Sequence, residues 1–159
     1  MRLTIVRHAS AGTKRAWAGP DIERPLDPDG ERDATALAKL LSGHPVGRLI
    51  SSPAVRCLQT LQPLAELAAR PIEAWDGLGT EAGPSNLKAC LQDPGLEHAV
   101  LCTHGEAMRP LLRSIDLDHL TKSDLPRDRR RLLTKGSAWR LRVTPRGKVV
   151  ELVHVVPQT

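Results

Sequence analysis

The chain has 159 residues, of which 40% are hydrophobic and 26% charged, a balance typical of a globular protein with a sizeable core. It contains three Trp and no Phe or Tyr, so it lacks the aromatic platforms on which single-stranded nucleic acids stack. The formal net charge of +5 favours anionic partners, but does not choose between nucleic acid, a membrane surface and a phosphorylated substrate.

The three cysteines form no Cys-x-x-Cys pair and cannot all pair with one another, which indicates a reducing compartment. No apolar run is long enough for an export signal or a membrane span. We therefore expect a cytoplasmic protein without membrane contacts. No feature of the sequence indicates an oligomeric state.

The first elements are a strand and a capped helix. Residues 3–6 are apolar and mostly β-branched, which predicts a buried strand that ends before His8. A loop of small residues follows. Asp27 is a favourable N-cap and Pro28 suits the first helical position, and apolar residues then recur at helical spacing as far as Leu41.

The pattern of strand and helix then repeats. Residues 46–51 indicate a second strand, after which Ser52-Pro53 should cap a helix that carries Arg56. Pro63 should kink or restart that helix.

The middle of the chain continues in the same way. Residues 71–75 indicate a third strand, residues 77–85 a loop, and residues 85–91 a short helix. Residues 99–102 form another continuous apolar run, which predicts a buried strand that ends before His104 and leads into a further helix.

The tail differs, because residues 138–143 and 149–153 alternate between apolar and polar, with a Pro-Arg-Gly turn between them. This pattern predicts a hairpin with a half-exposed face. Strands that alternate with helices predict the α/β class: a three-layer α/β/α sandwich with a mainly parallel central sheet and a C-terminal antiparallel hairpin. No linker divides the chain, so we expect residues 1–159 to form a single domain.

A basic run at Arg127–Arg131 stands out from the otherwise scattered charge. Such runs are usually solvated loops. A second interpretation is that these arginines, with Lys135, hold additional phosphate groups of a substrate.

Two histidines share one context, because His8 and His104 each stand just past the carboxyl end of an apolar strand. Ligands of open α/β sheets bind outside these strand ends, so neighbouring strands would bring both imidazoles to one crevice. Arg56, in the first turn of a helix that follows a strand, would reach the same edge. With Arg7, these groups suit a doubly charged tetrahedral anion.

In order along the chain, these segments resemble the motifs of the histidine phosphatase superfamily. Residues 3–9 resemble its Arg-His-Gly signature, although Ala9 replaces the glycine. Residues 24–30 are similar to the segment that opens the family's first helix, and residues 51–60 to its Ser-x-x-x-Arg-x-x-Gln-Thr segment. His104-Gly105 looks like its second histidine.

The resemblance implies a phosphatase that hydrolyses phosphomonoester or phosphoramidate bonds through a phosphohistidine intermediate on His8. Arg7, Arg56 and His104 would bind the phosphoryl group, and His104 would also act in catalysis. Neither a metal nor another cofactor is expected, since no cluster of carboxylate, His or Cys residues has metal-ligand spacing.

The resemblance also suggests Glu81 as the general acid, because the family often places an acidic residue in this loop. A bound phosphate would raise its pKa by like-charge repulsion. Glu106 is the rival candidate, although its position favours the first turn of a helix.

The chain is most similar to the short, phosphohistidine-phosphatase-like members of the family and to the phosphatase-like domain of some actinobacterial nudix fusion proteins. A phosphorylated small molecule, a nucleotide or a phosphoprotein are the candidate substrates. A phosphoryl-transfer mutase is less favoured, because the chain lacks room for a substrate cap. Two further hypotheses are a non-catalytic phosphate-binding module and, with little support, a nucleic-acid binder.

Overall fold

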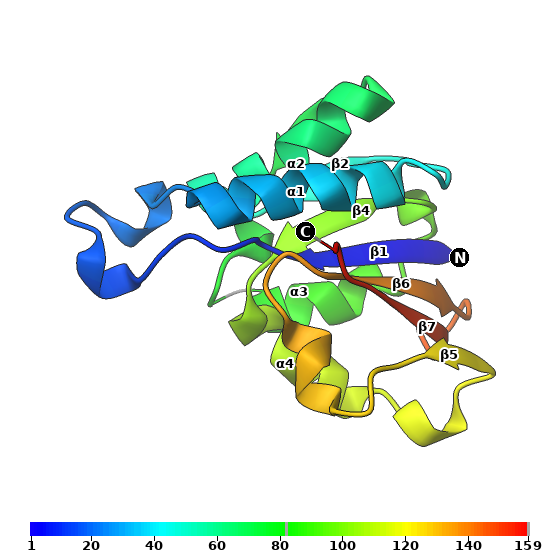
Figure 1. Ribbon diagram of the computed structural model, residues 1–159. Helices are drawn as coiled ribbons and strands as arrows, with labels where there is room; N and C mark the ends of the chain where they lie inside the picture. The colour runs from blue at the N-terminus through cyan, green and yellow to red at the C-terminus, as the bar shows by residue number, and fades with distance from the viewer. Residues whose placement is uncertain (82, 159) are drawn as a thin grey trace.

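The computed structural model describes residues 1–81 and 83–158. A seven-stranded sheet forms its middle layer, in the order β3-β2-β4-β1-β6-β7-β5 (Figure 1). The strands are β1 (Arg2–Arg7), β2 (Leu49–Ser51), β3 (Ile72–Ala74), β4 (Val100–Thr103), β5 (Lys122–Asp124), β6 (Ala138–Val143) and β7 (Val149–Val155). The helices are α1 (Pro28–Leu41), α2 (Val55–Ala68), α3 (Gly83–Cys90) and α4 (Gly105–Ser114).

The sheet is mainly parallel, as the alternation of strands and helices predicts. Strands β3, β2, β4 and β1 run parallel to one another, and β6 and β7 form the expected antiparallel hairpin beside β1. Strand β5, which pairs in parallel with β7, was not predicted from the sequence. Its three residues are all exposed and carry no apolar pattern, so the sequence offered no signal for it.

Two apolar layers sandwich the sheet. Neighbouring residues of β1 point to opposite faces: Val6 packs with Leu37 of α1 and other residues of α1 and α2, whereas Ile5 packs with Leu87 of α3 and Met108 of α4. The structure thus confirms the three-layer α/β/α architecture.

The loop that follows β1 is tied to the start of α1. Asp27 caps this helix, because its Oδ1 accepts a hydrogen bond from the backbone N–H of Gly30 at 2.7 Å. Its Oδ2 accepts from the backbone N–H of Gly12 at 3.0 Å. Gly30 leaves space for this loop, since a Cβ at residue 30 would lie 2.0 Å from the carbonyl oxygen of Ser10. One carboxylate therefore fixes both the helix and the loop that begins at His8.

Several boundaries differ from the sequence-based predictions. Strand β2 covers three residues rather than 46–51, because the backbone N–H of Gly47 bonds to His98 in a loop instead of joining the ladder. The N-cap of α2 is Ala54 rather than Ser52, whose hydroxyl has another partner described below. Pro63 does not end α2, which continues to Ala68.

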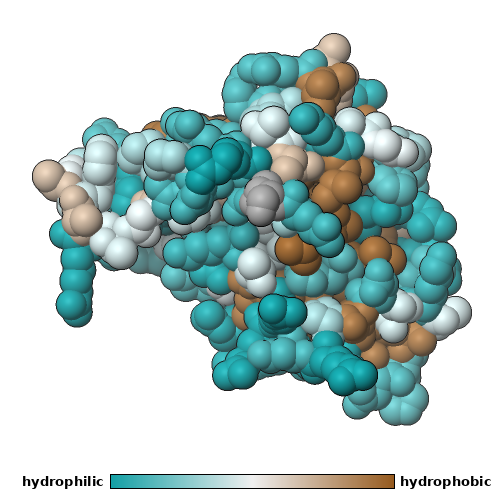
Figure 2. All heavy atoms as spheres, viewed as in Figure 1, coloured by the Kyte–Doolittle hydropathy of each residue, from teal (hydrophilic) through white to brown (hydrophobic). Residues whose placement is uncertain are grey.

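The segment between β1 and α1 projects beyond the carboxyl end of β1, at the left of Figure 1. It contains two 3-10 turns, Lys14–Ala16 and Asp21–Glu23. Figure 2, in the same view, shows hydrophilic residues over most of the surface on this side. None of the helices formed by the described residues is long and apolar enough to cross a membrane.

Candidate active site

His8 and His104 are brought together by the pairing of β1 with β4. The two strands are parallel neighbours with Arg7 in register with Thr103, so the residue after each is one of the two histidines. Their ring centroids lie 5.3 Å apart, with the ring planes at 65°. The expectation that both imidazoles meet at one sheet edge is therefore confirmed as geometry.

His8 is held in one tautomer by its own loop. Its Nδ1 lies 2.8 Å from the carbonyl oxygen of Ala9, which can only accept a hydrogen bond, so Nδ1 carries the proton and Nε2 keeps its lone pair. The side chain is buried, and this burial lowers the pKa of His8 to about 3, against the opposing effect of the hydrogen bond to Ala9 and with the charges of Arg56 and Arg7 adding to the lowering. His8 is thus neutral at neutral pH.

His104 is oriented by Arg56 and Ser52, and Sγ of Cys57 also lies 3.6 Å from its Nε2. Nη2 of Arg56 donates to its Nδ1 at 3.3 Å, and a guanidinium can only donate, so the proton resides on Nε2. That Nε2 lies 2.8 Å from the hydroxyl oxygen of Ser52, to which it donates. The same hydroxyl oxygen also accepts a hydrogen bond from the backbone N–H of Ala54, the N-cap of α2, at 3.3 Å. The N–H at Nε2 is a donor that an anion could take over from the serine.

The guanidinium groups of Arg7, which is partly buried, and Arg56, which is buried, each have a donor without a partner among the described residues. Within the described chain, the Nε atoms of Arg7 and Arg56 are buried and make no hydrogen bond. An unpaired buried polar group costs roughly 1–3 kcal/mol, more when it is charged. Both residues lie close enough to His8 for their charges to lower its pKa. Two idle donors beside a neutral imidazole indicate a site for an oxyanion.

Arg7 is positioned by the turn Arg129–Leu133 and by α4. Its Nη1 donates to the backbone carbonyl of Leu133. Gly105 lets the guanidinium lie against the first turn of α4, because a Cβ at residue 105 would be 2.8 Å from its Cζ. The indole N–H of Trp139 donates to the carbonyl of Leu132 at 2.6 Å and anchors the same turn in the core.

Asp21 is a site residue that the sequence reasoning missed. Its Oδ2 lies 3.1 Å from Nη2 of Arg56, and its backbone carbonyl accepts from Nη1 at 2.8 Å. A second ion pair joins its Oδ1 to Nε of Arg24 at 3.1 Å. The available signal was its position three residues before Arg24, just ahead of the segment 24–30 that resembles a family motif.

The cavity beside these groups has a volume of about 330 Å³. Ser52, Arg56 and His104 line one part of it, while the 3-10 turn at Asp21 lines another. Glu81 lines this cavity as well, whereas His8 and Arg7 do not. The remaining lining residues are Ile22, Pro53, Ala54, Asp76, Gly79 and Thr80.

The rival carboxylate, Glu106, is exposed in the first turn of α4 and does not line this cavity. Asp76, which the sequence reasoning did not consider, does. Glu81 therefore shares the cavity with a different competitor from the one expected.

The basic run does not line the cavity either. Its arginines lie in or beside the exposed turn Arg129–Leu133, where Arg130 pairs with Asp128 at 3.0 Å. Lys135, in contrast, is close to the site. Burial lowers its pKa, and the charges of Arg7 and Arg24 lower it further.

No three side chains of the His, Cys, Asp or Glu type are grouped to hold a metal ion in the part of the chain that the structure describes.

Comparison with known proteins gives concordant results. Residues 3–81 match the family model of the histidine phosphatase superfamily (branch 1). The chain is 33% identical over 115 residues to an 8-oxo-(d)GTP phosphatase of Mycolicibacterium smegmatis, an alignment that covers 68% of this chain and 35% of that protein. The chain thus spans about a third of the length of that curated relative.

Solved structures share the fold along nearly the whole chain. The protein histidine phosphatase SixA, complexed with tungstate, superimposes with a TM-score of 0.74 at 20% identity, covering 99% of this chain and 97% of the other. A phosphoserine phosphatase of Entamoeba histolytica, in complex with 3-phosphoglyceric acid, superimposes with a TM-score of 0.65 at 15% identity, covering 99% and 97%.

Proposed function

Because the chain belongs to the histidine phosphatase superfamily, we propose that it is a phosphatase that hydrolyses phosphomonoester or phosphoramidate bonds through a phosphohistidine on His8. One observation carries the proposal: a neutral imidazole with a free Nε2 lies among the charges of two arginines, each with a buried Nε–H that makes no hydrogen bond within the described chain. Nucleophile and anion-binding groups are thus present together.

In the first step, Nε2 of His8 attacks phosphorus in line and the bond from phosphorus to the leaving atom breaks. Arg7 and Arg56 donate to the equatorial oxygens, where negative charge collects. The Nε2–H group of His104 donates a hydrogen bond to a phosphoryl oxygen, in place of its hydrogen bond to Ser52. These groups need only position the substrate and stabilise charge, so the proposed reaction requires no metal.

Glu81 donates a proton to the leaving atom as the general acid. In the second step, the resulting carboxylate takes a proton from water, the water oxygen attacks phosphorus, and the bond to Nε2 of His8 breaks. Phosphate leaves and the starting enzyme is restored.

The nucleotide class of substrate is supported by the similarity to an 8-oxo-(d)GTP phosphatase. Lys135 lies near the arginines of the site, because burial lowers its pKa and the charges of Arg7, Arg24 and Arg56 lower it further. A cation beside those that hold the reacting phosphoryl group would suit a nucleoside diphosphate or triphosphate.

The test is phosphate release from p-nitrophenyl phosphate in the presence of a chelator. We expect turnover by the wild type and a loss of about 10³-fold or more in His8→Ala, since the nucleophile is removed. His119→Ala is the matched control, because His119 is exposed, pairs with Asp116 and does not line the cavity. Near-normal activity of His8→Ala would refute the mechanism.

Stoichiometric capture of phosphate without turnover would instead identify a binding module. Isomerisation of a phosphorylated substrate faster than phosphate release would identify a mutase.

A further inference from the structure

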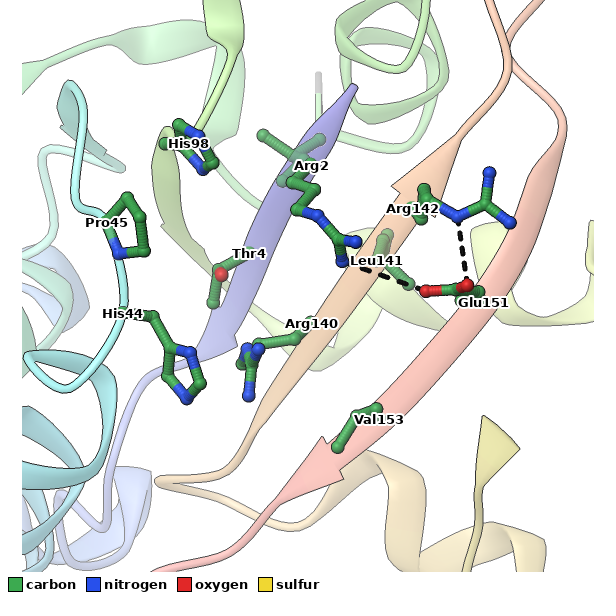
Figure 3. A pocket seen from close by; sticks show the side chains of 11 residues that line it. Arg2, Thr4, His44, Pro45, His98, Arg140, Leu141, Arg142, Glu151 and Val153 are labelled. Atoms are coloured by element: carbon green, nitrogen blue, oxygen red, sulfur yellow. Dashed lines mark ion pairs between the residues drawn. The ribbon is translucent and has the colours of Figure 1, made fainter. Parts of the chain in front are cut away.

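A second hollow, of about 360 Å³, lies on the sheet beside the amino-terminal half of β1 (Figure 3). We call it the basic groove, and its charged or titratable residues are Arg2, His44, His98, Arg140, Arg142 and Glu151. None of these residues lines the cavity around His104.

The groove exists because helices cover only part of this sheet face. Arg2 and Thr4 of β1 are on the same side of the strand as Val6, which is buried beneath α1 and α2. Arg140 of β6 is the register partner of Thr4 and shares this face. In Figure 1, α1 and α2 cover the upper part of the sheet face that is turned toward the viewer. No helix lies in front of β6 and β7 in this view.

In the first row of side chains across the groove, the positive charges are partly neutralised by a carboxylate. Arg2 and Arg142 are register partners on β1 and β6, and Arg142 is in turn the partner of Glu151 on β7. The carboxylate of Glu151 pairs with both arginines, at 3.7 Å from Nη1 of Arg2 and 3.0 Å from Nε of Arg142. The dashed lines in Figure 3 mark these two ion pairs.

The next row along the same face holds Thr4, Arg140 and Val153, and it contains no acid. Within residues 1–81 and 83–158, the guanidinium of Arg140 has neither a hydrogen-bond nor an ion-pair partner. Burial lowers its pKa, and the charge of Arg2 adds to this. The groove thus brings together three guanidinium groups and one carboxylate.

Two histidines form the opposite wall. Figure 3 shows the imidazole of His44 and the guanidinium of Arg140 pointing toward each other across the hollow. Burial and the charge of Arg140 both lower the pKa of His44. His98 has a left-handed backbone with φ of +61°, held by hydrogen bonds of 2.7 Å to Arg2 and Gly47.

A partly buried arginine without a partner lowers the stability of the fold, because its charge loses hydration that no other group replaces. Proteins retain residues that lower their stability where those residues are needed to bind a ligand. The planar fork of a guanidinium matches phosphate oxygens, and a hydrogen bond between two such charged groups is stronger than one between neutral groups. We propose that the basic groove is a second anion-binding site, separate from the cavity at His104, that takes a small ligand carrying a phosphate or diphosphate group.

The test is a titration with inorganic pyrophosphate followed by NMR, because the imidazole resonances of His44 and His98 report on the groove and the amide of Gly105 reports on the other site. We expect saturable shifts of both sets with separate dissociation constants. Arg140→Gln should weaken binding measured at His44 by at least about tenfold and leave binding measured at Gly105 unchanged. Arg32→Gln, which removes an exposed arginine of α1 that pairs with Asp29, is the matched control and should change neither.

A second readout separates binding from a structural role. Without pyrophosphate, Arg140→Gln should unfold at a higher temperature than the wild type, because it removes a partly buried charge that has no partner and that the charge of Arg2 repels. A lower unfolding temperature would make Arg140 a structural residue. The absence of saturable shifts at His44 up to about 10 mM pyrophosphate, or an equal loss of binding in Arg32→Gln, would also overturn the proposal. Failure at Gly105 alone would count against the proposed function and not against the groove.

Discussion

The carboxylate of Asp21 accepts a hydrogen bond from Nη2 of Arg56 at 3.1 Å. The same guanidinium group also donates to His104, while its Nε makes no hydrogen bond within the described chain. The backbone carbonyl of Asp21 takes a second donor at 2.8 Å. An anionic side chain thus competes for a group that the proposed reaction needs for phosphate.

We therefore expect Asp21→Asn to bind inorganic phosphate more tightly, with an inhibition constant about fivefold lower, or roughly 1 kcal/mol, as for a partly exposed ion pair. Product inhibition of p-nitrophenyl phosphate hydrolysis measures this constant. Asp29→Asn, which breaks an exposed ion pair with Arg32, is the control and should leave it unchanged. A higher inhibition constant in Asp21→Asn would show that Asp21 instead holds Arg56 in place.

The role of Glu81 is tested by changing the leaving group. Glu81→Gln should slow the hydrolysis of alkyl phosphates much more than that of aryl phosphates, because aryl leaving groups need less protonation. Asp76→Asn is the matched variant, since Asp76 lines the same cavity. Measuring kcat/KM on both substrate classes decides the assignment. An equal loss on both classes in Glu81→Gln would show that Glu81 is not the general acid. A loss confined to alkyl phosphates in Asp76→Asn would identify Asp76 as the general acid instead.

The burial of neutral His8 makes stability depend on pH. Its pKa falls from 6.5 in the unfolded chain to about 3 in the native protein, so between these values the unfolded chain binds a proton that the native protein does not. The free energy of unfolding should therefore rise with pH through this window, by at most about 1.4 kcal/mol per pH unit from this group, and this contribution is complete above pH 6.5.

Urea unfolding at about pH 5 and about pH 7 measures the effect, and His8→Asn should lose less stability than the wild type on acidification. Equal losses in the two proteins would mean that His8 is protonated in the native state.

Gly30 should tolerate no side chain. In Gly30→Ala the new Cβ would lie 2.0 Å from the carbonyl oxygen of Ser10, which belongs to backbone tied down by Asp27. We expect a loss of about 1–3 kcal/mol in unfolding free energy, as for overpacked sites. Gly43→Ala is the control, because the nearest atom there is 3.6 Å away. Chemical denaturation of both variants tests this, and similar stabilities would contradict the steric argument.

The sequence was sufficient for the features that depend on local pattern. Apolar runs before His8 and His104 identified the two strands, and rules for ligand sites in α/β sheets predicted that their ends meet. The cap at Asp27 and the hairpin also followed from local chemistry, since turn and cap residues act on their immediate neighbours.

What the sequence could not supply were contacts across the fold. Asp21 meets Arg56 only because the loop after β1 folds back over α2, and no periodicity records that path. Ser52 has the residue type of an N-cap, yet its hydroxyl is taken by a histidine 52 positions away. Strand β5 is made of exposed residues, and only its pairing with β7 makes it a strand.

The place of β4 between β2 and β1 determines when the site can form during folding. Strands β1 and β2 do not pair with each other, so the first part of the chain cannot complete the sheet on its own. As the chain emerges from a ribosome, His8 and Arg56 appear well before His104, and they remain unassembled until β4 inserts between their strands. This closure joins residues far apart in sequence, which makes it slow relative to local helix formation. Phosphate affinity should therefore appear late in folding, and its onset reports the completed sheet.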